Sequence, residues 1–429
     1  MFDHVYVTIT RVRAHLSSAA APSDDGWVDL VDLRSNPRQV DLFSLASTSC
    51  LLTELGSTHG LPPGKYQQIR VYLLDNSAAS GPSANACGNG NGFNCVVPVG
   101  GSPRILALSS EAQTGIKIPP GQIAGGGITI RAGQSADFDI DFDSSASIVH
   151  QGNGVFRLKP TLRASAVALN NNSLSGTVVD SVSNNPFEEA VVLLEQPDSS
   201  GIDRVVNGGL TGADGTFIFC PVPNPDGNAT YDIVIAAQTI SSQLVTTTYN
   251  ATIAFRVPVG TALNSPPITL VPESTSPTGF PGATITGQVT TAGAGAVVGD
   301  VTLSALQQAT PTGGSPLLVT LPVLGALAQP PTIMTTDTPA PGPACPASTD
   351  CFNYALVVPA SNPQVGTFSG GSITFSAPLA GTVTYSLNAI APSCTGVTPA
   401  SGTIDAIAVT PGATAAVNTP LAFTGCTAP

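Results

Sequence analysis

The stretch FDHVYVTITRVRAH (residues 2–15) decides the fold class of this chain. Val5, Val7 and Ile9 alternate with polar or hydroxyl-bearing residues, and β-branched side chains are frequent. This period of two is typical of a strand with one buried face. No positively charged leader with an apolar run precedes it. We therefore expect a mature or trimmed form of an exported chain, whose first domain starts inside a sheet.

The composition extends this prediction to the whole chain. Of 429 residues, 42% are hydrophobic and only 10% are charged, while Gly (44) and Pro (38) are abundant. Small apolar and hydroxyl residues with many turn formers favour strands over helices. We predict an all-β protein of three tandem β-sandwich domains, Ig-like or transthyretin-like in type.

The domain boundaries follow from composition and from an internal repeat. The first domain is expected at 1–168 and the second at 169–272, and a Pro/Ser/Thr-rich linker at 273–282 leads to the third at 283–429. LSGTVVDSVSNNPFEEAVVLLE, which begins at Leu174, aligns with ITGQVTTAGAGAVVGDVTLSA, so that Gly176 matches Gly287. Further along, TYDIVIAA (230–237) is matched with NYALVVPA (353–360), with a Pro/Thr-rich insertion before it. Two copies of one module are expected.

Motifs in the first two segments carry family resemblances. FDHVYVTITRVRAH, LPPGKYQQIRVYL and IRAGQSADFDIDFDSSASIVHQGNGVFRLKPTLRA, in that order, resemble an uncharacterised domain family of bacterial exported lipoproteins, over residues 2–166. SGTVVD and TGADGTFIFCPVPNPDGNATYDIVIAA look like a carboxypeptidase-regulatory-like or Cna-B-type module, and the third segment is a diverged relative. The first resemblance implies an exported setting and no known activity.

Two departures from these families affect the prediction. The usual lipid-attachment cysteine and first strand of the lipoprotein family are missing, so either the recorded sequence is truncated or a neighbouring copy fills the gap by strand addition. Cna-B-type modules often carry a Lys–Asn cross-link, but no lysine follows Lys159. That cross-link is excluded from the second and third segments.

The cysteines predict disulfides in an oxidising compartment. Their number is eight, and no C-x-x-C motif occurs. Close spacing pairs Cys87 with Cys95, Cys345 with Cys351, and Cys394 with Cys426. Cys50 and Cys220 are left over: they bridge two domains, bridge two chains, or sit reduced in a core.

The charge distribution excludes nucleic acid as a partner and suggests a covered surface. The net charge is −13, and residues 257–429 contain no Lys or Arg. Nucleic acid is held mainly by such cations. A free soluble surface normally mixes charges of both signs. We expect neighbouring copies or glycans to cover this one, or hydroxyl and amide side chains to keep an extracellular domain soluble. No stretch is long enough to span a membrane as an apolar helix.

ADFDIDFD (136–143) is the sharpest polar pattern. On a strand, its aromatic and aliphatic residues face inward and its acids share the outer face. Neighbouring basic residues could compensate the repulsion, and so could a Ca²⁺ ion, which prefers oxygen ligands. The acids concerned are Asp137, Asp139, Asp141 and Asp143.

Other chemistry is sparse in the sequence. N-x-[ST] triplets at Asn171, Asn228 and Asn250 are weak glycosylation candidates. No G-x-S-x-G elbow occurs, and the four histidines lack metal-ligand spacing. We therefore predict no enzyme, no catalytic residue and no cofactor other than possible calcium.

The resulting prediction is a non-enzymatic, extracellular structural protein. It would be a subunit of a bacterial surface fibre that assembles with copies of itself by strand addition, or an adhesin that contacts surface glycans. The alternative is a monomeric, lipid-anchored surface protein that binds calcium or a glycan.

Overall fold

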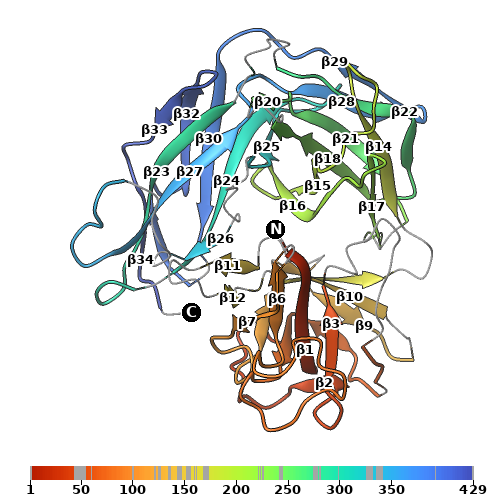
Figure 1. Cartoon of the computed structure of the whole chain (residues 1–429), viewed down its shortest axis with the longest axis vertical. Coiled ribbons are helices and arrows are strands. Elements are labelled where there is room, and N and C mark those ends of the chain that lie inside the picture. Colours follow the sequence, from red (N-terminus) through yellow and green to blue (C-terminus); the bar gives the residue numbers. More distant parts are fainter. Residues whose placement is uncertain are drawn as a thin grey trace. The chain divides into compact units, whose positions relative to one another are not determined.

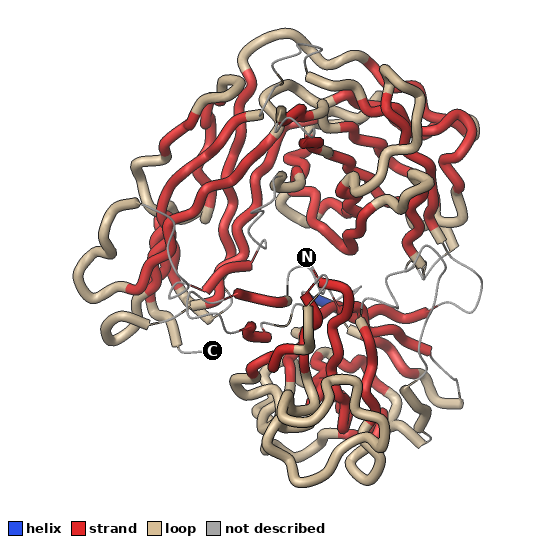
Figure 2. Tube along the Cα trace, viewed as in Figure 1, coloured by secondary structure: helices blue, strands red, loops and turns tan. Residues whose placement is uncertain are grey.

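The computed structural model describes most of the chain. The described residues are 2–42, 55–58, 60–98, 101–119, 122–123, 127–133, 137–142, 147–150, 156–158, 160, 162–167, 173–220, 222, 224, 227–240, 245–273, 279, 282–297, 299–324, 332–334, 342–391 and 393–427. Strands and loops make up nearly all of them (Figure 2). The all-β prediction is confirmed. None of these residues forms a helix of the length and hydropathy needed to cross a bilayer.

The chain divides into two compact units. The N-terminal unit comprises Met1–Ser173 and Cys220–Gly227, and the C-terminal unit comprises Leu174–Phe219 and Asn228–Pro429. The predicted first domain thus corresponds to most of the N-terminal unit. The predicted second and third domains lie together in the C-terminal unit.

Strand β1 (Phe2–His15) is the centre of the N-terminal unit. Its first half pairs with β6 (Cys95–Pro98) and β3 (Arg38–Asp41), and its second half pairs with β5 (Gln68–Leu73) and β2 (Val28–Asp32). Tyr6, Ile9 and Arg11–Ala14 each have two strand partners, so this part of β1 is not a sheet edge. The hypothesis that a neighbouring copy fills a gap left by a missing first strand stays a prediction.

The remaining strands of this unit complete one large sheet and two small ones around a single apolar core. Val5, Val7 and Ile9 lie in that core, as the alternation predicted. The other strands are β7 (Arg104–Ala107), β8 (Ile116–Ile118), β11 (Ile148–His150) and β12 (Phe156–Leu158) in the large sheet, and the pairs β4 (Gly64–Tyr66) with β9 (Ile128–Ile130) and β10 (Asp137–Phe142) with β13 (Leu162–Val167).

The C-terminal unit contains the predicted repeat. β14 (Leu174–Asp180) pairs antiparallel with β17 (Thr216–Phe219) and parallel with β22 (Ala262–Leu270). Likewise β23 (Ala283–Thr291) pairs antiparallel with β27 (Asp350–Val358) and parallel with β34 (Leu421–Thr424). The same two pairings in the same senses identify β14 and β23 as equivalent strands.

The same steric constraint explains why both aligned positions are glycine. Gly176 lies opposite Phe217, and Gly287 lies opposite Tyr354. A Cβ atom on either glycine would overlap the facing aromatic side chain. Each module therefore needs a residue without a side chain at this position, because an aromatic ring from the paired strand covers it.

The second half of the repeat differs from the sequence alignment. β15 (Val191–Pro197) pairs antiparallel with β18 (Thr230–Ala236), and β24 (Asp300–Ala309) pairs in the same way with β30 (Val383–Ile390). The partner of TYDIVIAA is therefore TYSLNAIA (384–391), not NYALVVPA, which forms most of β27 in a different sheet. Both candidate segments are apolar strands, and alternation alone does not identify the sheet to which a strand belongs.

The two modules share one sheet, although the sequence suggested separate domains. β25 (Leu317–Leu321) adds parallel to β16 (Ile202–Leu210), and β28 (Gln364–Ser369) adds parallel to β21 (Thr252–Pro258). Strands from after residue 282 thus cover both edges of the β16–β15–β18–β21 sheet (Figure 1). One apolar core contains residues of both modules, for example Phe255 and Tyr385. The added strands and the shared core therefore join the two modules into one unit.

The remaining strands of the C-terminal unit are short or lie at sheet ends. β29 (Ser372–Ser376) and β32 (Thr403–Val409) are the two terminal strands of the eleven-stranded sheet. The others are β19 (Gln238–Ile240), β20 (Thr246–Thr248), β26 (Thr332–Met334), β31 (Gly396–Thr398) and β33 (Thr414–Ala416).

Candidate functional site: a buried acid pair below a pocket

Strand β18 carries an acidic residue inside an otherwise apolar run. Ile233 and Ile235 of TYDIVIAA are buried, and so are Val234 and Ala236 on the other face. A strand covered on both faces reads as a continuous hydrophobic run. Asp232 is the exception: it is only 5% exposed. A lone carboxylate in such a run is a sequence signal that could have identified the site.

Two more acids are buried beside Asp232 in the same sheet. Glu195 on β15 is directly opposite Asp232, and one of its oxygens accepts a hydrogen bond from the backbone N–H of Thr320 at 3.2 Å. Asp203 on β16 is fully buried, and no N–H or O–H donor among the described residues reaches its carboxylate oxygens. A buried carboxylate without donors is costly, so we expect it to hold a proton.

The pKa shifts follow from this environment. Burial, together with the charge of Asp232 within hydrogen-bonding reach, raises the pKa of Asp203 to about 9. Burial also raises the pKa of Asp232, against the opposing effects of hydrogen bonds from Asp203 and from the backbone of Arg256. At neutral pH, Asp203 therefore holds a proton that it can share with Asp232.

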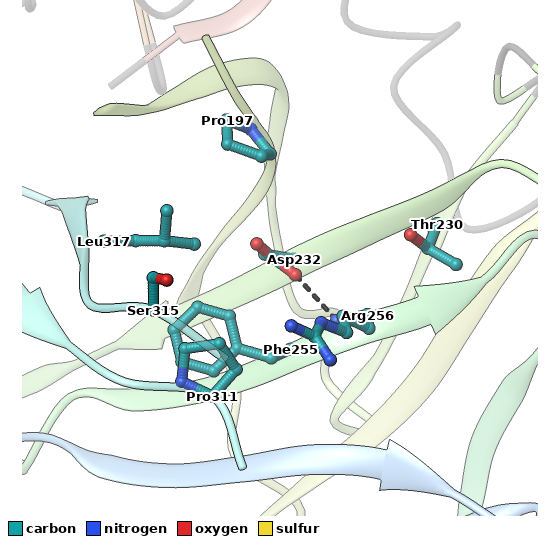
Figure 3. Close-up of a pocket in the computed structure, with 8 residues that line it drawn as sticks. All are labelled: Pro197, Thr230, Asp232, Phe255, Arg256, Pro311, Ser315 and Leu317. Atoms are coloured by element: carbon teal, nitrogen blue, oxygen red, sulfur yellow. Dashed lines mark hydrogen bonds between the residues drawn. The ribbon is translucent and has the colours of Figure 1, made fainter. Parts of the chain in front are cut away.

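A β-bulge places Arg256 next to this pair. The register between β18 and β21 shifts so that Phe255 and Arg256 together oppose Asp232. Arg256 has a positive φ of 59°, and its backbone N–H donates to Asp232 Oδ1 at 2.7 Å. Bulges bend a strand locally and change the direction of a side chain. Here the exposed Arg256 side chain lies beside Asp232, and the dashed line in Figure 3 marks the backbone bond.

A pocket of 390 Å³ lies over Asp232. Polar groups from Thr230, Asp232, Arg256 and Ser315 face it together with an apolar wall (Figure 3). That wall consists of Pro197, Phe255, Pro311 and Leu317. A few polar groups within an apolar lining is the usual construction of a small-ligand site.

The second module shows that the fold does not need these acids. The register pair Glu195 and Asp232 corresponds to Leu306 and Ser386 in the equivalent strands β24 and β30. The second module therefore forms the same strand pairing with an apolar and a hydroxyl residue. The acids are a specific addition to the first module.

The chemistry open to the site is limited by its geometry. Within the described part of the chain, no three His, Cys, Asp or Glu side chains are placed to hold a metal ion. The arrangement suits the binding of a polar molecule by acceptor and donor groups.

The predicted acidic face lies elsewhere, on β10 of the N-terminal unit. Phe138, Ile140 and Phe142 pack against the core as predicted. By backbone register, Asp141 lies opposite Arg163 on β13. Asp143 lies outside the described residues, and calcium binding by these acids stays a prediction.

The cysteines form the three close pairs that their spacing indicated. Disulfide bonds join Cys87 to Cys95, Cys345 to Cys351, and Cys394 to Cys426. Cys220 is also disulfide-bonded, so the alternative that it is reduced is wrong. Cys50 lies outside the described residues.

The three glycosylation candidates have different surroundings. Asn228 is exposed. Asn250 is only 6% exposed and accepts a hydrogen bond from the Ser361 hydroxyl at 2.6 Å. A glycan on Asn250 does not fit the folded chain, because attachment needs an accessible side chain. Asn171 lies outside the described residues.

Comparisons with known proteins match only the first part of this sequence to a family. Residues 1–160 match a family described as a domain of unknown function (DUF4382). A search of the curated proteins gives no match. The description of this family gives no activity, so the match is a similarity without a functional inference.

Solved structures of pilins show a slight likeness to this chain. The minor pilin of Streptococcus agalactiae is 12% identical, with 59% of this chain and 96% of that one covered and a TM-score of 0.18. The shaft pilin SpaA of Lactobacillus rhamnosus GG is 8% identical over 59% and 98%, with a TM-score of 0.17. A streptococcal ancillary pilin is 10% identical over 69% and 80%, with a TM-score of 0.18. At these values the likeness carries no functional inference.

Proposed function

We propose that this chain is a non-enzymatic structural protein of the bacterial cell surface, a filament subunit or an adhesin. The observation that carries the proposal is the addition of β25 to β16 and of β28 to β21. Separating the two modules requires breaking both ladders and opening one shared core at the same time. Such a unit is suited to bearing load, and it uses strand addition inside one chain.

The setting agrees with a surface role. Three disulfide bonds favour an oxidising compartment. The absence of Lys and Arg from residues 257–429 favours a surface covered by copies of the same chain or by glycans. In this proposal the main partner is another copy, and export places both outside the cell.

Electron microscopy tests the proposal directly. Native cell-surface material is labelled with an antibody to this chain and viewed in negative stain. We expect labelled filaments with a regular axial repeat, or label along an adhesive surface structure. Label confined to single particles would contradict the proposal that the chain forms a filament.

A second candidate function rests on the pocket over Asp232. Carboxylate, guanidinium and hydroxyl groups beside an apolar wall suit a sugar, which offers both hydroxyl groups and apolar C–H faces. This site would serve an adhesin, or the alternative of a lipid-anchored glycan-binding protein. Binding to an immobilised glycan panel should weaken at least tenfold in Arg256→Gln and remain unchanged in Arg34→Gln, an exposed arginine of the N-terminal unit.

A further inference from the structure

Two edge strands of the C-terminal unit carry features that block pairing with another chain. β32, one end of the large sheet, contains Asp405 and a register shift at Ala406, whose φ is 58°. β22, an edge of the small sheet, contains Pro266 and Pro267. Charges, bulges and prolines are the usual protection of sheet edges.

The opposite end of the large sheet has no such protection. β29 has the sequence SITFS, with neither charge nor proline. It pairs with β28 without a register shift, from the pair of Ser369 with Ser372 to the pair of Val365 with Ser376. Gly370 and Gly371 form the two-residue turn between them, both with positive φ. In Figure 1, β28 and β29 are labelled next to one another at this end of the sheet.

The turn determines which backbone groups face outward. In a two-residue hairpin the residues that flank the turn, Ser369 and Ser372, form a hydrogen-bonded pair, and such pairs alternate along the ladder. Thr374 and Ser376 therefore bond to β28. The N–H and C=O groups of Ile373 and Phe375 point away from β28, and no strand among the described residues pairs with them.

Charge favours a second copy as the partner of this edge. The chain carries a net charge of −13, so two copies repel over most of their surfaces. No charged residue lies between Asp350 and Asp405, a segment that contains β28, β29 and β30. Two copies that meet along β29 avoid contacts between like charges. Leu379, which is 79% exposed and lies just beyond the strand, adds apolar surface near the same edge.

We propose that β29 pairs antiparallel with β29 of a second copy, about a two-fold axis at Thr374. Ile373 of each copy then lies opposite Phe375 of the other, so that the four outward N–H groups meet four C=O groups. Thr374 lies opposite its own equivalent in a non-hydrogen-bonded pair, where Cβ atoms are about 4.5–5.5 Å apart. This contact rests on the proposed function, because it supplies one of the copy-to-copy contacts of an assembly.

Cysteine cross-linking of the full chain tests this register. Thr374 and Ser376 are both exposed, and the described cysteines are all in disulfides. We expect Thr374→Cys to give a disulfide-linked dimer under mild oxidation, because the paired positions meet disulfide geometry. Ser376→Cys is the matched control: in the proposed register, two copies of residue 376 lie about 13 Å apart. Mixing Ser372→Cys with Ser376→Cys should restore cross-linking, since these positions face one another.

Sedimentation of the wild-type chain separates the possible failures. If the wild type self-associates but Thr374→Cys cross-links no faster than Ser376→Cys, the contact lies elsewhere, and the β29 proposal is wrong while assembly stands. If the wild type and every variant remain monomeric, both the β29 contact and the homopolymer are contradicted. Faster cross-linking of Thr374→Cys, together with rescue in the mixed pair, supports the proposal.

Discussion

Asp203 on β16 and Asp232 on β18 lie within hydrogen-bonding reach of each other although β15 runs between their strands. Both are buried, and their strands belong to the sheet that also includes strands of the second module. A pair of acids in this position can hold one negative charge more easily than two, because burial and like charge both oppose the second ionisation. The free energy of unfolding should therefore depend on the ionisation of this pair.

The free energy of unfolding should fall as the pH rises from about 4 toward 9. The pKa of Asp203 is about 9 in the folded chain and about 3.9 in an unfolded one, so the folded state keeps a proton that the unfolded state releases. A folded state with more bound protons loses stability as pH rises, by roughly 1.4 kcal/mol per pH unit for one proton. Burial raises the pKa of Glu273 to about 7, which acts in the same direction up to that pH.

Asp203→Asn should reduce this slope. The amide keeps the shape and can donate to Asp232 without ionising. Urea unfolding at pH 5, 7 and 9 measures the effect. Asp214→Asn is the control, because Asp214 is exposed and bonds to Thr216, and this variant should keep the wild-type slope. An unchanged slope in Asp203→Asn would show that Asp203 is ionised in the folded chain.

Two substitutions of Arg256 should change stability in opposite directions. Its φ of 59° is unfavourable for any residue with a Cβ atom and most unfavourable for a β-branched one. Arg256→Gly should raise the free energy of unfolding by up to about 1 kcal/mol, and Arg256→Val should lower it by about 1–2 kcal/mol. Both variants lose the same guanidinium and keep the backbone bond to Asp232, so their difference in thermal unfolding measures backbone strain. Equal stability of the two variants would contradict the presence of backbone strain at Arg256.

Gly287→Ala should destabilise the C-terminal unit by about 1–3 kcal/mol. A methyl group there would overlap the hydroxyl and ring of Tyr354, which is only 1% exposed and has little room to move. Gly295→Ala is the matched control, since its Cβ would meet no atom within 4 Å. Urea denaturation should show no loss, or a small gain, for the control. A neutral Gly287→Ala would mean that Tyr354 can shift.

The disulfide between Cys394 and Cys426 should contribute more stability than the one between Cys345 and Cys351. Their sequence separations are 32 and 6. In the loop-entropy account, removal of the longer link costs about 3.7 kcal/mol and of the shorter about 2.2 kcal/mol. Urea unfolding of the two double-Ala variants compares these losses. The reverse order would indicate that native packing, not loop entropy, determines the difference.

Local features of this protein were determined by the sequence alone. The alternation in FDHVYVTITRVRAH identifies both the strand and its buried face, since a period of two is a property of the strand itself. The three close cysteine pairs follow from short spacing across loops. Gly176 and Gly287 align because each module needs a glycine beneath an aromatic ring.

Long-range pairing was decided only by the tertiary structure. TYDIVIAA could be matched with either later apolar strand, because the pattern specifies faces and not partners. The merging of the two modules depends on β25 and β28 reaching sheet edges far away in sequence. The acid pair with Arg256 forms for the same reason: strand order and one bulge bring together residues whose spacing in the sequence contains no motif.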